Sequence, residues 1–475
     1  MNRLYKFSLI TSFFILAIVI VSSLFLHKDY IIKDYITNDS NHYVTSKKCL
    51  DCHQTYYDAW NETMHPKMFK IVDKPEEILG NFDEKNPVVT FNKDDIEFVI
   101  GSKWEQVYAR MIDGEYYPFT AKWMVVTQQW VPYKVNNWKD TPLSVKCNGC
   151  HTTGFNPQTY EFSEFGIGCE ACHGPGSKHV QNKRLETKWQ CTICHNALEN
   201  NSLENKAAEN HSSDIIVSYK SAVCGQCHSR GSQSVDNEHM TIKFNFPLEY
   251  IPGKEIGKEF KPLTKQQDKK GKYWWGNGIS KNRHQEYADF ARSKHAKSLK
   301  NLKEKRKESC GEPEDSCLQC HSTDYRMADK EHKPTLSEAK EGLTCIVCHE
   351  PHGIDKKYIR DTVGAHKCAE CHANSLSRST AETGKAHFPC PADKVKCADC
   401  HMPRIVSTGG AFSLRSHAFK IIPPQATEKY QMPNSCQNGG CHADKDLQWA
   451  KEVFNEYYPD IDKKSESDTE SEIKQ

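Results

Sequence analysis

Cysteine pairs followed at once by a histidine recur along the chain. The stretch GIGCEACHGPGSKHV (166–180) holds Cys169, Cys172 and His173 as C-x-x-C-H, and GLTCIVCHEPHG (342–353) repeats nearly the same frame. Nine such motifs begin at Cys49, Cys147, Cys169, Cys191, Cys224, Cys317, Cys345, Cys368 and Cys397. Two cysteines at this spacing reach the two vinyl groups of one haem, and the histidine supplies an axial nitrogen to the iron. The spacing therefore predicts c-type haem attachment.

A tenth motif, CQNGGCH (436–442), has four spacer residues instead of two. Its longer spacer must loop out, but the cysteine pair ends in the same Cys-His, and we expect it to carry haem as well. Zinc sites also use C-x-x-C pairs. However, zinc coordination does not require a histidine directly after the second cysteine of every motif. The prediction is ten haem c groups, or nine if the tenth motif is not used.

These ten motifs use 20 of the 22 cysteines. The predicted thioether cysteines are Cys49, Cys52, Cys147, Cys150, Cys169, Cys172, Cys191, Cys194, Cys224, Cys227, Cys317, Cys320, Cys345, Cys348, Cys368, Cys371, Cys397, Cys400, Cys436 and Cys441. The predicted proximal iron ligands are His53, His151, His173, His195, His228, His321, His349, His372, His401 and His442. We number the haems 1 to 10 in this order.

Composition indicates what the elements around these motifs are like. Hydrophobic residues make up 37 % of the chain, below the usual share of about 45–50 %. Side chains alone would build a poor core, so we expect the haems to form most of it. The predicted fold is mostly α, with much irregular chain wrapped around covalent haems and a small β insert near 87–135, where Val, Ile, Thr and aromatics are frequent. The net charge of +1 gives no sign of nucleic-acid binding.

The N-terminus predicts a location. Residues 7–26 form an uncharged run of 20 residues after a basic start, which is enough to span a bilayer. Because no clear small-residue cleavage site follows, we favour an uncleaved signal anchor over a cleaved signal peptide. The haem region would then face the periplasm of a bacterial inner membrane. If the segment is cleaved, the protein would be periplasmic or extracellular.

The motif spacing divides the chain into segments. We predict a signal anchor and transmembrane helix at 1–28, a stalk at 29–46, a first multihaem half at 47–245 with haems 1–5, a linker at 246–280, a second half at 281–458 with haems 6–10, and a disordered tail at 459–475. The halves resemble each other: YDAWNETMHPKMFK (57–70) matches YADFARSKHAKSLK (287–300), and four haem motifs follow each. The chain therefore reads as a duplication.

The second of these stretches has the periodicity of a helix. His284, His295, Leu299 and Leu302 fall on one stripe at helical steps. The two histidines would lie roughly 16 Å apart along a helix axis, too far to serve one iron but suited to two neighbouring haems. The repeat pairs His295 with His65, and both are therefore candidate distal ligands.

The motifs as a set resemble those of multihaem c-type cytochromes related to cytochrome c554. The resemblance rests on CHTTGF (150–155), CEACHGPGSKH (169–179), RHQEYADFARSKH (283–295), CHMP (400–403) and RSHAFKIIPP (415–424). It implies a mostly α multihaem wrap. The distal ligands that it implies are His65, His179, His284, His295, His352 and His417. Arg283, where the family often has a histidine, and the long tenth spacer depart from the pattern.

Histidines outside the motifs are numerous enough for two ligands on every iron. Twelve are candidates for ten distal positions, and His366 and His387 complete our set of likeliest ones. Full bis-histidine ligation closes both faces of each iron, which favours a non-catalytic electron carrier. If several of the loop histidines His42, His211, His239 and His332 are not ligands, one haem is open. The alternative is then an oxidoreductase acting on a small nitrogen or sulfur species.

The preferred function is electron transfer in a respiratory or extracellular pathway. Expected partners are redox proteins or a membrane quinol oxidase complex, the membrane itself through the N-terminal helix, and no nucleic acid. Cys310 and Cys390 remain outside the motifs, each seven residues before a haem motif. An oxidising compartment favours a bridge between them over two free buried thiols.

Overall fold

The computed structural model describes residues 41–183, 215–237, 240–304, 311–354, 367–372, 390 and 395–457. The predicted anchor (1–28), most of the stalk and the predicted tail lie outside this range. Among the described residues, no helix is both long and apolar enough to cross a membrane. From Tyr43 onward the chain clusters into one compact unit.

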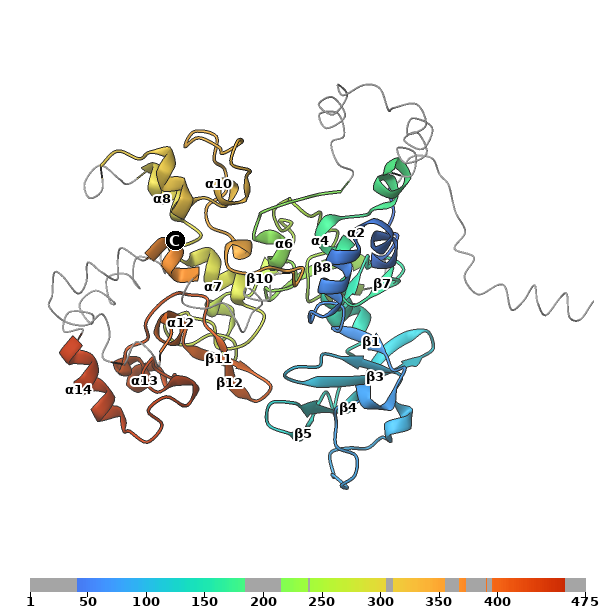
Figure 1. Ribbon diagram of the computed structural model, residues 1–475. Helices are drawn as coiled ribbons and strands as arrows, with labels where there is room; N and C mark the ends of the chain where they lie inside the picture. Colours follow the sequence, from blue (N-terminus) through green and yellow to red (C-terminus); the bar gives the residue numbers. More distant parts are fainter. Residues whose placement is uncertain are drawn as a thin grey trace, which may run out of the picture. The chain divides into compact units, whose positions relative to one another are not determined.

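The haem-free stretch of the first half is an antiparallel sheet of five strands in the order β1-β2-β3-β4-β5 (Figure 1). The strands are β1 (Phe69–Ile71), β2 (Phe98–Ile100), β3 (Gln106–Ile112), β4 (Glu115–Met124) and β5 (Gln129–Pro132). The predicted β insert is therefore present, although it begins earlier than 87, and residues 87–97 form turns and a short 3-10 helix (η2, Lys93–Asp95) before β2.

Both faces of this sheet are buried, because successive strand residues point to opposite sides. Val99 and Tyr108 pack into one aromatic cluster with Trp123 and Trp130. On the other face, Phe98, Ile100, Val107 and Ala109 pack with Phe69 and Leu143, and the partly buried Cys147 joins them. The second face therefore supports the haem 2 motif.

Smaller sheets connect the remaining segments. They are β6 (Thr152–Thr153) with β7 (Glu164–Phe165), β8 (Gly231–Asn237) between β9 (Met240–Phe244) and β10 (Lys261–Pro262), and β11 (Arg404–Thr408) with β12 (Ala411–Arg415). The β11–β12 hairpin builds a core with Trp275, Ile279 and Ile422, and Trp275 Nε1 donates to the Ile405 carbonyl at 3.0 Å. The segment predicted as a linker thus packs directly on the second half.

The helices are short. They are α2 (Ser46–Asn61), α3 (Gly149–His151), α4 (Cys169–His173), α6 (Ala222–Gly225), α7 (Glu286–Arg292), α8 (Ser298–Glu304), α9 (Leu318–His321), α10 (Thr323–Met327), α12 (Cys397–His401), α13 (Pro424–Tyr430) and α14 (Leu447–Tyr457). Together with the sheets they give a mixed fold of short helices, small sheets and irregular chain. The expectation of a mostly α fold is therefore wrong in its proportions, because the motif-free segments fold as strands.

The predicted long helix near 284–302 is also wrong. It is broken into α7 and α8, and His295 lies in the turn between them. His284 precedes α7 with a φ of 62°, in the left-handed region. Of the residues on the predicted stripe, Leu299 and Leu302 do share one helix, and they pack together with Leu318.

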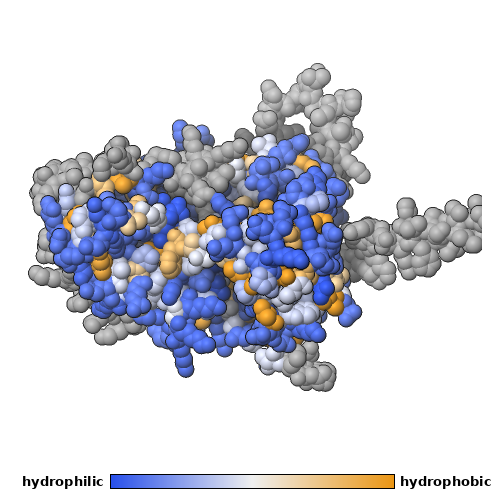
Figure 2. All heavy atoms as spheres, turned by 90° about the horizontal axis from the view of Figure 1, so that it is seen from below, coloured by the Kyte–Doolittle hydropathy of each residue, from blue (hydrophilic) through white to orange (hydrophobic). Residues whose placement is uncertain are grey.

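The surface is mostly polar. On the face shown in Figure 2, hydrophobic residues are scattered among hydrophilic ones. The large exposed hydrophobic side chains come from segments far apart in the sequence, for example Tyr56, Val217 and Ile251. The low hydrophobic content therefore goes with a small side-chain core, as the composition indicated.

Candidate haem-binding site

Each described C-x-x-C-H motif forms about one helical turn. Motifs lie on α2, α3, α4, α6, α9 and α12, and the motif at Cys368 lies in the helical stretch 367–372. At Cys345 the turn closes through the His349 N–H, which donates to the Cys345 carbonyl at 3.0 Å. Residues three and four apart on a helix share a face. One turn thus presents two thiols and an imidazole to the same side.

A cavity of about 2610 Å³ runs through the unit and is lined by side chains of the motifs of haems 2, 3 and 5 to 9. A pocket for a single drug-sized ligand is about 300–1,000 Å³. The cavity has room for several such groups. Its lining also includes four histidines from outside the motifs, namely His65, His284, His295 and His417.

Motif histidines face other histidines across short gaps. The ring centroids lie 6.4 Å apart for His53 and His179, 6.0 Å for His173 and His352, 6.2 Å for His349 and His417, and 6.1 Å for His372 and His295. Two imidazoles with nitrogen–metal bonds of about 2 Å on opposite sides of one iron would have centroids about 6 Å apart. The four pairs match this geometry.

Two further pairs lie within electrostatic range of each other. The charge of His228 of haem 5 lowers the pKa of His65, and that of His151 of haem 2 lowers the pKa of His284. All six histidines that the family resemblance implied as distal ligands thus lie near a motif histidine of a different segment. The two broken-helix histidines, His284 and His295, approach different motifs. This is the arrangement expected for two haems, reached without a continuous helix.

Burial favours the neutral, metal-binding form of five of these imidazoles. It lowers the pKa of His65 and of His151 to about 4, and it lowers the pKa of His173, His284 and His295 as well. A neutral imidazole has a free nitrogen lone pair for coordination. The residues therefore fit haem in their chemistry as well as their spacing.

The second ring nitrogen of several histidines is also engaged. Backbone carbonyls lie 2.8–3.2 Å from Nδ1 of four of them: Met68 O at His151, Ile216 O at His173, Ser298 O at His321 and Arg415 O at His417. An Nδ1–H donated in this way leaves Nε2 for the iron and fixes the ring orientation. At His352 the partner is instead a carboxylate, Glu350 Oε1, at 2.9 Å.

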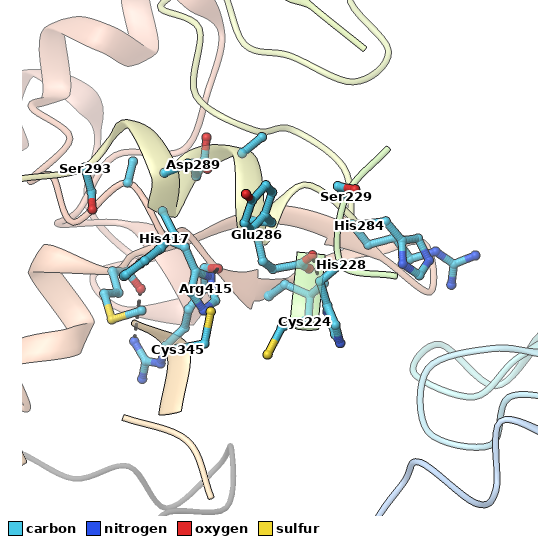
Figure 3. A pocket seen from close by; sticks show the side chains of 18 of the residues that line it. Cys224, His228, Ser229, His284, Glu286, Asp289, Ser293, Cys345, Arg415 and His417 are labelled. Atoms are coloured by element: carbon cyan, nitrogen blue, oxygen red, sulfur yellow. Dashed lines mark hydrogen bonds and ion pairs between the residues drawn. The ribbon is translucent and has the colours of Figure 1, made fainter. Parts of the chain in front are cut away.

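A second carboxylate lies inside the cavity. Glu286 projects from α7 toward His228 (Figure 3). Its Oε2 is 3.7 Å from His228 Nδ1. Burial alone would lower the pKa of His228, but the Glu286 carboxylate raises it above its ordinary value. Conversely, the pKa of Glu286 lies well below its usual range, because His228 outweighs the burial.

Thiols of different motifs approach one another. Contacts join Cys49 with Cys169, Cys150 with Cys227, Cys224 with Cys345, Cys320 with Cys371, and Cys368 with Cys397. Electrostatic coupling adds Cys172 with Cys227 and Cys348 with Cys368. The attachment sites of haems 1, 3, 5, 7, 8 and 9 thus follow one another as neighbours, with those of haems 2 and 6 beside haems 5 and 8.

The tenth motif adjoins haem 9. Its spacer forms a short 3-10 turn with Gly439 and Gly440 at positive φ. Asn438 in this turn is buried and bonds the backbone of Asp399 and Arg404, next to the haem 9 motif. The spacer therefore loops out, as expected, but the loop is anchored on its neighbour.

Cys390 lies near this tenth site. A negative charge on Cys390 would raise the pKa of Cys400 and of Cys436, and a negative charge on Cys441 would raise the pKa of Cys390. Cys310 is outside the described residues, and the predicted bridge stays a prediction. The haem 4 motif (Cys191, Cys194, His195) and the candidates His366 and His387 are also outside that range. His332 is exposed.

The sequence reasoning missed the acidic residues around the histidines. Glu286 and Glu350 follow His284 and His349 closely, and this proximity was the available signal. It also missed Glu105, a buried residue of the β insert that pairs with Arg283 and with Lys122. Arg283 had been noted as a departure from the family pattern, and its role is to tie the His284 segment to the insert.

Comparisons with known proteins agree with this site. The family model for cytochrome c554 and c-prime matches residues 48–93, 125–174 and 281–350, and a model for a doubled CXXCH motif matches 332–376. No curated protein matches the chain. Among solved structures, the outer cell wall cytochrome OcwA is 27 % identical with a TM-score of 0.71, over 88 % of each chain. An undecaheme cytochrome from the S-layer of Carboxydothermus ferrireducens is 20 % identical with a TM-score of 0.48, over 87 % of this chain and 59 % of that one.

Proposed function

We propose that this chain, a multihaem c-type cytochrome related to the cytochrome c554 family, binds ten haems and serves as an electron carrier with mainly bis-histidine irons. The observation that carries the proposal is the set of facing histidines. Four motif histidines have a partner imidazole 6.0–6.4 Å away, and two more have one in electrostatic range.

When bound, each haem iron supplies a one-electron couple, and two imidazole ligands favour a low potential. The protein's own part would be to hold an iron between the two imidazoles of each pair, so that these irons would have no ligand position for a substrate. The pairs do this with residues from distant segments: His179 serves haem 1, His284 haem 2, His352 haem 3, His65 haem 5, His417 haem 7 and His295 haem 8.

Continuity of the attachment sites supports a carrier rather than a store of isolated centres. Thiol contacts connect the motifs of haems 1 and 3, 5 and 7, and 8 and 9, and electrostatic coupling between thiols connects those of haems 3 and 5 and of haems 7 and 8. Asn438 anchors the tenth motif beside the ninth. Neighbouring attachment sites are the condition for electrons to cross from one end of the unit to the other. The ends of this series are haems 1 and 10.

The proposed location is outside the cytoplasm, with the apolar run at 7–26 as a membrane tether. That run is long enough for a bilayer. The more similar of the two solved structures is an outer cell wall cytochrome, which favours an extracytoplasmic site for this chain too. The proposed partners are redox proteins or a membrane quinol oxidase complex.

One observation favours the second candidate, an oxidoreductase with an open haem. Among the described residues, the ring contact of His442 is with Trp449, at 4.7 Å, and not with a histidine. An iron held by His442 alone would keep one ligand position for a small nitrogen or sulfur species. Haem 10 is the place where this activity would reside.

The ferric absorption and electron paramagnetic resonance spectra separate the two functions. A pure carrier is entirely low-spin, and its spectrum does not change with cyanide or nitric oxide. A high-spin fraction near one tenth that disappears with cyanide would instead support an open haem. If most of the haem is high-spin, the paired histidines are not ligands and the proposal fails.

A further inference from the structure

The loop His349-Glu350-Pro351-His352-Gly353 meets three haem sites. His349 belongs to the haem 7 motif, and His352 faces His173 of haem 3 across 6.0 Å. The backbone at Pro351 hydrogen-bonds to His65, which lies near His228 of haem 5. Sites of both halves of the chain thus converge on five consecutive residues.

Glu350 is held in a fixed position within this loop. Its Oε1 accepts from the His352 N–H at 3.0 Å and from His352 Nδ1 at 2.9 Å, and its Oε2 accepts from the Ile354 N–H at 2.7 Å. Its side chain is 24 % exposed. Since two backbone donors anchor the carboxylate, the contact with the imidazole does not depend on a freely rotating side chain.

A carboxylate on Nδ1 differs from a carbonyl. It bears a full negative charge, raises the basicity of the ligating nitrogen and stabilises the more positive, ferric state of a bound iron. At four other haem-site histidines, His151, His173, His321 and His417, Nδ1 instead faces a backbone carbonyl, that of Met68, Ile216, Ser298 and Arg415 respectively. His352, the proposed distal ligand of haem 3, thus differs from these four histidines, and the Glu350 carboxylate lies nearer to it than Glu286 does to His228 of haem 5, at 2.9 Å against 3.7 Å.

The internal repeat provides a comparison. GIGCEACHGP in the first half aligns with GLTCIVCHEP in the second, so Gly174 occupies the place of Glu350. Gly174 has a φ of 79°. It has no side chain and therefore provides no carboxylate to His179, the proposed distal ligand of haem 1 from the same loop. The difference between the two repeats thus coincides with a difference in ligand environment.

We propose that Glu350 is a positioning residue that, through His352, holds haem 3 at a lower reduction potential than the haems whose axial histidines donate to carbonyls. This inference rests on the proposed function, because it requires His352 to be a ligand. A lower reduction potential at haem 3 would create a difference in potential where the sites of haems 3 and 5 of the first half meet that of haem 7 of the second half.

The test is a spectroelectrochemical titration of the holoprotein with the variant Glu350→Gln. Glutamine keeps the size of the side chain and one acceptor oxygen, which can still face His352, while its amide nitrogen replaces the oxygen that accepts from the Ile354 N–H. The variant therefore loses the charge and one backbone hydrogen bond of the loop. We expect one haem to shift about tenfold toward the ferrous form, a rise of about 59 mV for a one-electron couple. The control Glu338→Gln removes an equal charge from an exposed carboxylate bound to Thr335, and it should leave all potentials in place.

A second variant, His352→Ala, identifies the haem and separates the two ways of failing. It should turn one low-spin haem high-spin, and the species that is lost should be the one whose potential moves in Glu350→Gln. No spectral change in His352→Ala would overturn the ligand assignment of the proposed function. A normal His352→Ala result with unchanged potentials in Glu350→Gln would overturn this inference alone and leave Glu350 as a structural brace.

Discussion

Replacing Glu105 by glutamine should weaken the attachment of the β insert to the segment of His284. Glu105 is the shared partner of Arg283 and Lys122, with Lys122 Nζ at 2.8 Å, and its side chain is only 10 % exposed. Arg283 directly precedes His284, the proposed distal ligand of haem 2. The variant Glu105→Gln leaves two cations without their counter-charge.

The expected loss of stability follows from this burial. Removing one partner of a fully buried ion pair costs about 3–5 kcal/mol. Because the Arg283 side chain is 32 % exposed, we expect somewhat less, about 2–4 kcal/mol. Burial favours the neutral acid, yet Arg283 and Lys122 outweigh it and lower the pKa of Glu105. The stabilisation is therefore present at neutral pH and lost only as the pH falls through the lowered pKa.

Denaturation of wild type and variant, followed by far-ultraviolet circular dichroism at pH 7, measures the loss. A matched control is Glu62→Gln, since Glu62 pairs with Lys67 at 4.0 Å and is 79 % exposed. That pair should contribute about 0–1 kcal/mol. The Glu105 variant should also acquire high-spin haem earlier in the transition. Equal stability of the two variants would refute the reasoning.

Three further predictions follow from the site. His65→Ala and His295→Ala should each convert one haem to high spin while the other haems stay low-spin; unchanged spectra would show that neither histidine is a ligand. The mass of the denatured protein should exceed that of the polypeptide by ten haems, by nine if Cys436–His442 is not used, and an excess of four or fewer would contradict the site. Thiol labelling of the denatured, unreduced protein should find no free cysteine if Cys310 and Cys390 are bridged, whereas two labelled cysteines would exclude the bridge.

The motifs could be predicted from the sequence because their chemistry is local. Two thiols and a histidine on one helical turn require only five consecutive residues, and the similarity between the two halves can be read directly from the sequence. The resemblance also named histidines such as His352 that do approach a motif. By contrast, which motif each would face could not be derived, because His352 belongs to the second half and pairs with His173 of the first.

The helix near 284–302 shows where periodicity misleads. Leu299 and Leu302 have helical spacing because α8 packs them against Leu318. His284 and His295 are not on one helix: His284 precedes α7 and His295 lies in the turn between α7 and α8, and both line the cavity. The strands of the insert were recognisable from their β-branched and aromatic residues, whereas the role of Glu105 depends on a contact 178 residues away in sequence.

An anaerobic coulometric titration tests the central claim most directly, because it counts the electrons that one chain takes up while the haem spectrum is recorded. The account predicts ten electrons per chain, all accompanied by low-spin ferric haem turning ferrous and all returned to an added oxidant. Nine would remove the tenth motif from the count. An uptake of four or fewer, or a haem population that is mainly high-spin before reduction, would contradict a chain of bis-histidine haems.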